Sequence, residues 1–113
     1  MEDIVMQGLL YDFYGELLTE HQRSMYEDVI YNDLSLGEIA EEKGISRQGV
    51  HDLIKRCDKS LKAYESKLHL VEKFQQTKAM VAEIHGLTKN YIETGNMECI
   101  REIEKISSEI IEL

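Results

Sequence analysis

Apolar residues recur every three or four positions through almost the whole chain, and no segment shows the alternation of period two that is typical of a strand. Steps of three and four place side chains on one face of an α-helix. Proline would remove a backbone N–H donor from the interior of a helix, and the sequence contains no proline. Its 113 residues, of which 42% are hydrophobic, suffice for one core. We therefore predict a single all-helical domain over residues 1–113.

Two capping boxes divide the first part of the chain into short helices. Thr19 is followed three positions later by Gln22, and Ser35 is followed in the same way by Glu38. Each hydroxyl can cap a helix whose third residue reaches back to it. The predicted helices cover about 3–18, 20–32 and 36–43. The residues expected to face the core from the first two are Ile4, Val5, Leu9, Phe13, Leu17, Leu18, Met25, Val29 and Ile30.

The stretch EIAEEKGISRQGVHDLIKRC, residues 38–57, indicates two helices around a tight turn. Ala40 supplies the small residue needed where two helices cross at a wide angle. Gly44 tolerates a positive φ in the turn, and Ser46 can cap the second helix. The residues expected to seal the contact are Ile39, Ile45, Val50 and Leu53. We predict a helix-turn-helix; an ordinary helical hairpin is the alternative.

The helix that begins at Arg47 carries a long apolar row whose phase changes near residues 64–70. The first part of the row is Val50, Ile54, Cys57, Leu61, Tyr64, Leu68 and Val71. The second part is Leu70, Phe74, Thr77, Val81, Ile84 and Tyr91. No glycine or proline marks the change, so a bend and a switch of packing partner both fit this pattern.

The tripeptide TGN at 94–96 predicts a stop and a new start, because Gly95 can end one helix and Asn96 can cap the next. We therefore expect residues 66–113 to form a long C-terminal helical hairpin. The final helix is expected to bury Ile100, Ile103, Ile106 (or Ser107) and Ile110. This row serves either as the core of the hairpin or as the seam of a homodimer.

Charge is distributed unevenly along the chain, whose formal net charge is -9. Residues 1–42 contain eleven acidic residues and one basic residue, whereas residues 43–62 contain six basic and two acidic residues. A local field decides contact with a charged ligand, while net charge mainly governs solubility and long-range steering. The second helix of the motif is therefore the candidate contact with nucleic acid.

The candidate nucleic-acid-binding residues lie at the start and on the free side of that helix. They are Ser46, Arg47, Gln48, His51, Lys55, Arg56 and Lys59. Gln48 could read adenine, and Arg47 could read guanine or hold a phosphate. Asp52 lies in the middle of this surface and repels phosphate. We therefore expect DNA binding to be weak and sensitive to salt; a solvated helix face without a ligand is the alternative.

Other function classes find little support in the sequence. The two cysteines, Cys57 and Cys99, lack CxxC spacing, and we find no partner of ligand type four residues from any of the four histidines, so we expect no metal site and no cofactor. No nucleophile–base arrangement or phosphate-binding glycine loop stands out, so we expect no enzyme. The start MEDIVMQGLL is acidic, and no apolar run approaches the roughly 20 residues of a membrane span. We expect a cytoplasmic protein without membrane insertion.

The segment LTEHQRSMYEDVIYNDLSLGEIAEEKGISRQGVHDLIKRCDKSLKAYE, residues 18–65, resembles the fourth conserved region of bacterial sigma factors. The resemblance implies a sigma region-four-like helix-turn-helix core over residues 19–65. With the continuation LKAYESKLHL and the helical tail, nearly the whole chain resembles the YlxM-like family of small helix-turn-helix proteins. On that resemblance, the recognition-helix positions are occupied by Arg47, Gln48, His51, Lys55 and Arg56.

The resemblance implies a bacterial regulatory protein that binds nucleic acid. Genes of this family commonly lie beside those for the signal recognition particle, which implies a role in that pathway. The alternative is an accessory protein that binds the RNA or the GTPase of that particle by protein contact, without DNA readout. A third alternative is a structural dimer that keeps the fold without touching nucleic acid.

Overall fold

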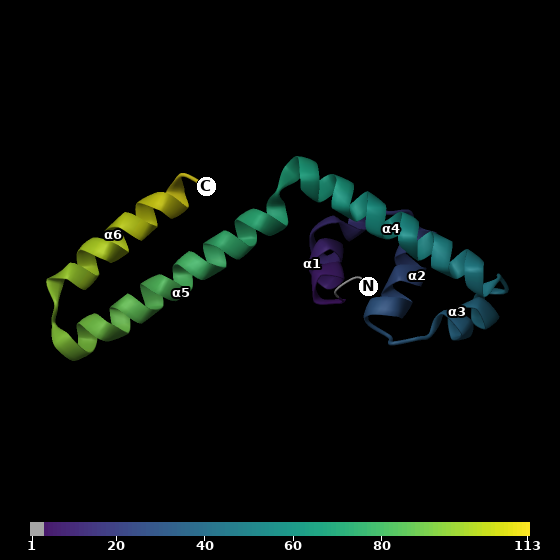
Figure 1. Ribbon diagram of the computed structural model, residues 1–113, viewed down its shortest axis with the longest axis horizontal. Helices are drawn as coiled ribbons and strands as arrows, with labels where there is room; N and C mark the ends of the chain where they lie inside the picture. The colour runs from purple at the N-terminus through teal and green to yellow at the C-terminus, as the bar shows by residue number, and fades with distance from the viewer. Residues whose placement is uncertain (1–3) are drawn as a thin grey trace. The chain divides into compact units, whose positions relative to one another are not determined.

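A computed structural model describes residues 4–113, which form helices and no strand (Figure 1). The elements are α1 (Ile4–Tyr14), a single 3₁₀ turn η1 (Gly15–Leu17), α2 (Glu20–Ile30), α3 (Leu36–Lys43), α4 (Arg47–Leu68), α5 (Leu70–Thr94) and α6 (Met97–Ile111). The chain divides into two compact units, Met1–Val71 and Glu72–Leu113. The all-helical prediction is confirmed for this part of the chain. The predicted start of the first helix at Asp3 lies outside the described residues. No helix among residues 4–113 is long and apolar enough to span a bilayer.

The predicted helix starts are formed by local hydrogen bonds. The Thr19 hydroxyl accepts from the Gln22 amide at 3.2 Å, and the Gln22 side chain accepts from the Thr19 amide at 3.0 Å. Ser35 makes the same reciprocal pair with Glu38. These boxes satisfy amides that the first turn of a helix leaves without partners. The helix starts at Glu20 and Leu36 are therefore encoded within four residues of sequence.

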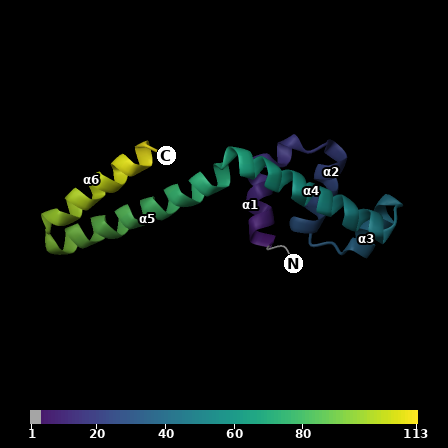
Figure 2. The ribbon, with the colours of Figure 1, turned by 45° about the horizontal axis from the view of Figure 1, so that its top comes forward.

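The core of the first unit forms where α1, α2 and α3 pack against α4 (Figure 2). From α4, the predicted row is confirmed at Val50, Ile54, Cys57 and Leu61, all of which are buried. Outside α4, the buried apolar residues of this core are Leu10, Tyr11, Tyr14, Leu18, Met25, Tyr26, Ile39, Ala40 and Val71. At roughly 25 cal/mol per Å² of buried apolar area, this cluster is the main stabilising element of the unit.

The face that α1 buries differs from the predicted one. Ile4, Val5 and Leu17 are more than half exposed, and Phe13 is 38% exposed; of the predicted row only Leu18 is fully buried. The buried side of α1 is formed instead around Leu10 and two tyrosines, with Gln7 beside them. Tyrosine combines a large apolar ring with a hydroxyl that needs a partner, so an assignment based on aliphatic residues alone selected the wrong side.

A buried carboxylate joins three helices of the first unit. Asp58 of α4 is 6% exposed, and its Oδ1 accepts hydrogen bonds from the Gln7 side chain at 3.0 Å and from the Tyr26 hydroxyl at 2.5 Å. Burial and this hydrogen bond raise the pKa of Tyr26, so the phenol stays protonated and remains a donor. A buried charge is tolerated only when it is hydrogen-bonded in this way. Asp58 thus connects α1, α2 and α4 through polar contacts.

The break between α4 and α5 lies at His69, which adopts a left-handed conformation with φ of 56°. The Tyr14 hydroxyl donates to Glu65 Oε1 at 2.5 Å and accepts from the Leu70 amide at 3.1 Å. Glu65 Oε1 also accepts from the Val71 amide at 3.0 Å, so the first amides of α5 are satisfied by side chains. The phase change predicted at 64–70 is therefore a helix end and a new helix.

The second unit is the predicted antiparallel hairpin of α5 and α6, whose helices run side by side (Figure 1). Gly95 takes a φ of 68° between them, and the Asn96 side chain accepts from the Glu98 amide at 3.0 Å. Ile106 is buried and Ile103 and Ile110 are partly buried, as predicted, but Ile100 is 39% exposed. The α5 row is also shifted, because Phe74 and Val81 are exposed while Met80 and Leu87 are partly buried.

Candidate nucleic-acid interface

The corner between α3 and α4 has the geometry of a helix-turn-helix. Gly44 ends α3 with a φ of 69°, a conformation that glycine adopts without the steric cost of a Cβ atom. The Ile45 amide donates to the Ala40 carbonyl at 3.1 Å, which closes the turn. The Ser46 hydroxyl then accepts from the Gly49 amide at 2.9 Å and begins α4. Every role predicted for Ala40, Gly44 and Ser46 in the turn is confirmed.

The seal between the two helices is smaller than predicted. Ile39 and Val50 are fully buried and Leu53 is partly buried, but Ile45 is 40% exposed. Ile45 follows the left-handed glycine directly, where the chain is on the outside of the corner. The prediction for Ile45 is therefore wrong.

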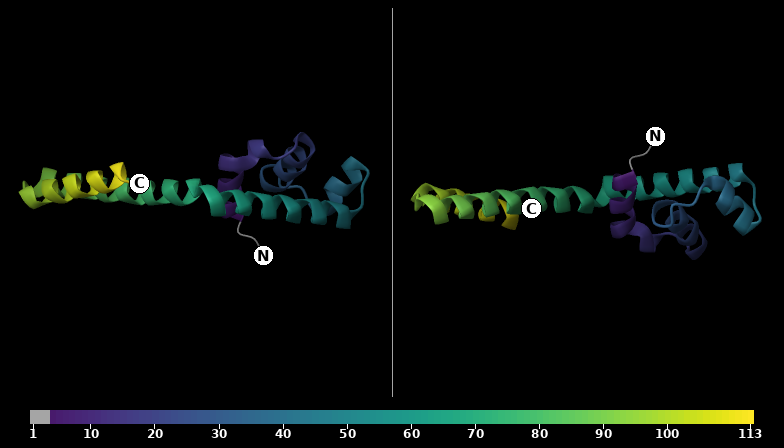
Figure 3. Two further views of the ribbon diagram at one scale, coloured as in Figure 1. Left: turned by 90° about the horizontal axis from the view of Figure 1, so that it is seen from above. Right: turned by 90° about the horizontal axis from the view of Figure 1, so that it is seen from below.

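The candidate contact residues lie on the side of α4 that faces away from the core. In both views of Figure 3, α2 and α3 lie on one side of α4. The side chains exposed along α4 include all seven predicted site residues, namely Ser46, Arg47, Gln48, His51, Lys55, Arg56 and Lys59. Gln48, Lys55 and Lys59 follow one another at intervals of seven and four, which aligns them on one stripe of the helix. The structure thus leaves this surface accessible to a ligand.

Asp52 engages two of the predicted contact residues. Its Oδ1 accepts a hydrogen bond from the Gln48 side-chain amide at 2.9 Å and lies 3.6 Å from Nδ1 of His51. Both donors that would meet base edges are therefore directed toward a carboxylate on their own helix. By contrast, within residues 4–113 no hydrogen bond or ion pair engages the charged ends of Arg47, Lys55 and Lys59. These cations are available to phosphate without losing a partner.

Gly49 serves the cap as well as the surface. A Cβ atom built on Gly49 would lie 3.1 Å from the Ser46 hydroxyl oxygen, which is closer than ordinary van der Waals contact. The same hydroxyl accepts from the Gly49 amide, so it cannot move away without losing the cap.

Because Asp58 is buried, basic side chains outnumber acidic ones more strongly on the exposed surface of residues 43–62 than in the segment as a whole. Of the two acids in residues 43–62, Asp58 is buried and hydrogen-bonded to two donors, and only Asp52 reaches the surface. The six basic residues of this segment are all exposed. A positive field over the outer side of α4 follows, although the chain as a whole is acidic.

Beside this surface lies a mainly apolar hollow of about 600 Å³ between α1, α2, α3 and α4. Its walls are formed by Ile4, Gln7, Val29, Leu36, His51, Ile54, Lys55 and Asp58. Two predicted contact residues, His51 and Lys55, therefore stand on the rim of a hollow that sequence analysis did not foresee. The signal for it was the apolar side chain of Ile4, which α1 leaves exposed.

A different hollow is acidic and lies along α2. It has a volume of about 400 Å³ and is lined by Glu20, Arg23, Ser24, Glu27, Asp28 and Asn32. Three carboxylates surround a single guanidinium there, so the local charge is negative. This surface repels phosphate and favours a cationic partner.

Two observations concern the residues considered for metal binding. Glu65 lies on α4, and His69 follows the last residue of this helix four positions later, so the prediction that no histidine has a partner of ligand type at this spacing is wrong. The Glu65 carboxylate already accepts from Tyr14 and from the Val71 amide, which gives it a structural role. Cys57 is fully buried, and this burial raises its pKa to about 11, so its thiol is neutral at physiological pH.

Comparison with known proteins agrees with this geometry. Residues 1–103 match UPF0122, a family described as "Putative helix-turn-helix protein, YlxM / p13 like". The chain belongs to the UPF0122 family. A UPF0122 protein of Thermoanaerobacter sp. (strain X514) is 43% identical over 113 residues, covering 99% of this chain and 97% of the relative.

Further relatives occur in other bacteria. A UPF0122 protein of Desulforamulus reducens is 40% identical over 112 residues, which cover 99% of this chain and 96% of the relative. A UPF0122 protein of Bacillus thuringiensis (strain Al Hakam) is 41% identical over 108 residues, covering 94% of this chain and 98% of the relative. The similarity therefore extends over the motif and the hairpin alike.

Proposed function

We propose that this UPF0122 protein is a nucleic-acid-binding regulatory protein that places the outer side of α4 on DNA. The observation that carries the proposal is the exposed basic surface of α4, presented by a helix-turn-helix corner whose turn and caps are complete. In this motif, the second helix enters the major groove and its first residues meet base edges. Arg47 and Gln48 occupy those positions here.

The hydrogen bonds and ion pairs of the exposed α4 residues indicate which of them bind phosphates and which bind bases. Lys55 and Lys59 have no partner among residues 4–113 and are suited to phosphates, which position the protein without reading sequence. Gln48 and His51 must first leave Asp52 to meet a base. Affinity therefore depends mainly on phosphate contacts, and we expect it to be weak and to fall steeply with salt.

The proposal is tested with the double variant Arg47→Ala/Lys55→Ala. Binding to a duplex from the promoter region of the protein's own operon is measured at several salt concentrations. Loss of the Arg47 contact to a base edge and of the Lys55 contact to a phosphate should weaken binding about tenfold or more at low salt and lower the salt slope by about one. The control, Arg101→Ala/Lys105→Ala, removes the same charge from α6. Equal affinity of the wild type and the α4 variant would refute the proposal.

A second candidate function rests on the acidic hollow of α2. An accessory protein of the signal recognition particle would use such a surface to bind a basic region of that particle's protein, and the α4 surface would be free for its RNA. Pull-down with the particle's protein and RNA tests this candidate. Recovery of neither component would count against it. In both cases we propose a binding protein rather than an enzyme. The proposal uses the charged surfaces of α4 and α2, and the sequence shows no recognisable arrangement of a nucleophile with a base.

A further inference from the structure

The hairpin of the second unit buries very little of its apolar surface. Among residues 72–113, only Cys99 and Ile106 are buried. The first unit, by contrast, has a contiguous core. A two-helix hairpin has too few neighbours to enclose its side chains, and helices of this length gain most of their stability from packing of an apolar face. The distribution of the remaining apolar residues is therefore informative.

Each helix of the hairpin carries two apolar stripes. Apart from Ser107, the buried or partly buried residues of the hairpin after Val71 are Thr77, Met80, Ile84, Leu87, Tyr91, Cys99, Ile103, Ile106 and Ile110, which mark the facing sides of α5 and α6. A further set is exposed, namely Val81, Ile92, Ile100 and Ile111, with exposed fractions of 52%, 76%, 39% and 82%. We call these four residues the apolar side of the hairpin.

The apolar side lies at a defined angle to the contact between the helices. Because successive residues of a helix are rotated by about 100°, Val81 and Ile92 lie about a quarter turn from the α6-facing residues of α5. On α6, Ile100 and Ile111 lie about a quarter turn from the α5-facing residues, in the same rotational sense. The two helices are antiparallel (Figure 1), so equal rotations place both sets on the same side of the hairpin.

Two stripes at a right angle are the pattern of a helix in a four-helix bundle, which contacts two neighbours. We propose that the hairpin of α5 and α6 pairs through its apolar side with the same side of a second copy of this chain, forming an antiparallel four-helix bundle. The partner that such a side requires is another hairpin of equal length with an apolar side of its own. The chain itself supplies that partner, and the pairing closes by two-fold symmetry.

The size of the apolar side is sufficient for such a pair. At 1.5 Å per residue, α6 is about 22 Å long and α5 about 37 Å, and the two together are about 20 Å wide. About 500 Å² on each copy, or roughly 1,000 Å² in the pair, would be covered, which is the area at which a specific interface forms. The charges at the edges of the apolar side are also complementary between two copies. Lys78 and Lys89 border this side on α5, and Glu104 borders it on α6.

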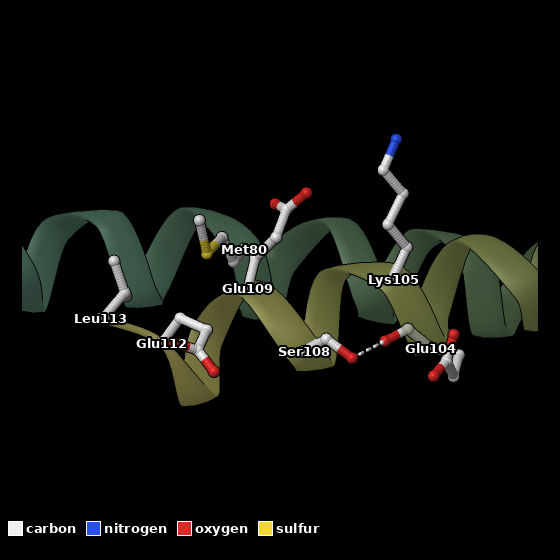
Figure 4. Close-up of a pocket in the computed structure, with 7 residues that line it drawn as sticks. All are labelled: Met80, Glu104, Lys105, Ser108, Glu109, Glu112 and Leu113. Carbon is white, nitrogen blue, oxygen red and sulfur yellow. Dashed lines mark hydrogen bonds between the residues drawn. The ribbon is translucent and has the colours of Figure 1, made fainter.

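A hollow near the C-terminal end of α6 is lined by none of the four residues of the apolar side. It has a volume of about 600 Å³, and its walls are Met80, Glu104, Lys105, Ser108, Glu109, Glu112 and Leu113 (Figure 4). Figure 4 shows the Lys105 and Glu109 side chains projecting from α6 across the α5 ribbon in this view, and the Ser108 hydroxyl donating to the Glu104 carbonyl, a hydrogen bond of 3.1 Å. Four of its seven lining residues carry a charged group, whereas the apolar side consists of β-branched aliphatic residues alone.

Sedimentation equilibrium of the full chain, without nucleic acid, tests the proposal. The wild type should sediment as a dimer, at twice the 13.1 kDa of one chain, over a concentration series in the micromolar range. Ile92→Asp/Ile111→Asp should raise the dissociation constant of the dimer at least about a hundredfold, because four apolar side chains per dimer are replaced by carboxylates. Ala79→Asp is the control, since Ala79 is exposed on the far side of α5.

Two results of the sedimentation experiment would overturn the proposal. A wild type that remains a monomer over the whole series overturns the proposal, and so does a dimer that survives Ile92→Asp/Ile111→Asp. The substituted side chains are largely exposed, so circular dichroism should show unchanged helix content in the variants. Because no nucleic acid is present, the result is independent of whether α4 binds DNA.

Discussion

Substitution of Asp52 should strengthen DNA binding, because this carboxylate opposes it in two ways. Asp52 holds the Gln48 amide at 2.9 Å, and breaking such an exposed hydrogen bond costs about 0.5–1.5 kcal/mol. Its charge also repels phosphate, by roughly 0.6 kcal/mol for each phosphate about 7 Å away in water. Asp52→Ala removes both effects, so we expect a gain of about 1–2 kcal/mol, or about 5–30-fold in affinity.

The assay is fluorescence anisotropy of a labelled duplex titrated with protein at low salt. Asp52→Asn separates the two effects, since it removes the charge but keeps an oxygen that can accept from Gln48; it should give about half of the gain in free energy. Glu109→Ala is the matched control, because it removes one negative charge from an exposed position of α6. We expect Glu109→Ala to change affinity less than about twofold.

Two results would refute the reasoning. If Asp52→Ala binds no more tightly than the wild type, α4 does not meet the duplex through the side that carries Gln48. If Asp52→Ala and Glu109→Ala strengthen binding equally, only the net charge of the chain matters. The salt series distinguishes these cases further, because the gain from charge decreases with salt whereas the gain from the hydrogen bond does not.

Asp58→Ala should lower the free energy of unfolding by about 3 kcal/mol or more, measured by urea denaturation, because it leaves Tyr26 and Gln7 buried without an acceptor; an unchanged midpoint would contradict this role. Gly44→Ala should cost about 1 kcal/mol in the same assay, because φ at this residue is 69°. In a Cys99→Ser variant, Cys57 should react with a thiol reagent at neutral pH only after unfolding. Fast labelling of the native protein at pH 7 would contradict this burial. Burial raises the pKa of Cys57 from 9.0 to about 11, so the contribution of the neutral thiol to the free energy of unfolding is fully present below pH 9.0. This contribution should be lost as the pH rises toward 11.

Helix ends could be predicted from the sequence because their causes are local. Ser35, Gly44 and Ser46 each act on atoms within five residues, through a hydroxyl or through freedom from a Cβ clash. No distant contact is needed to form these caps, so a single sequence suffices to locate them. The exposed positions of the candidate contact residues on α4 could also be predicted, because the helical period places them away from the buried row of the same helix.

Burial could be predicted less well, because it depends on contacts between distant segments. Asp52 and Asp58 are both aspartates of α4, yet Asp52 is exposed and Asp58 is buried. The difference is made by Gln7 and Tyr26, which lie more than thirty residues away along the chain. For the same reason periodicity places Val81, which is 52% exposed, in one apolar row with the partly buried Ile84 and Tyr91. Periodicity identifies an apolar stripe but does not say which partner covers it.

The break at His69 is held by tertiary contacts, and this has a spectroscopic consequence. A residue other than glycine in the left-handed region carries a local cost, which Tyr14 and Glu65 offset only while α1 is in place. The backbone chemical shifts of His69 should therefore report, from the far end of α4, whether α1 is docked. A protein without glycine or proline at this position thus contains a natural NMR probe for the integrity of its first unit.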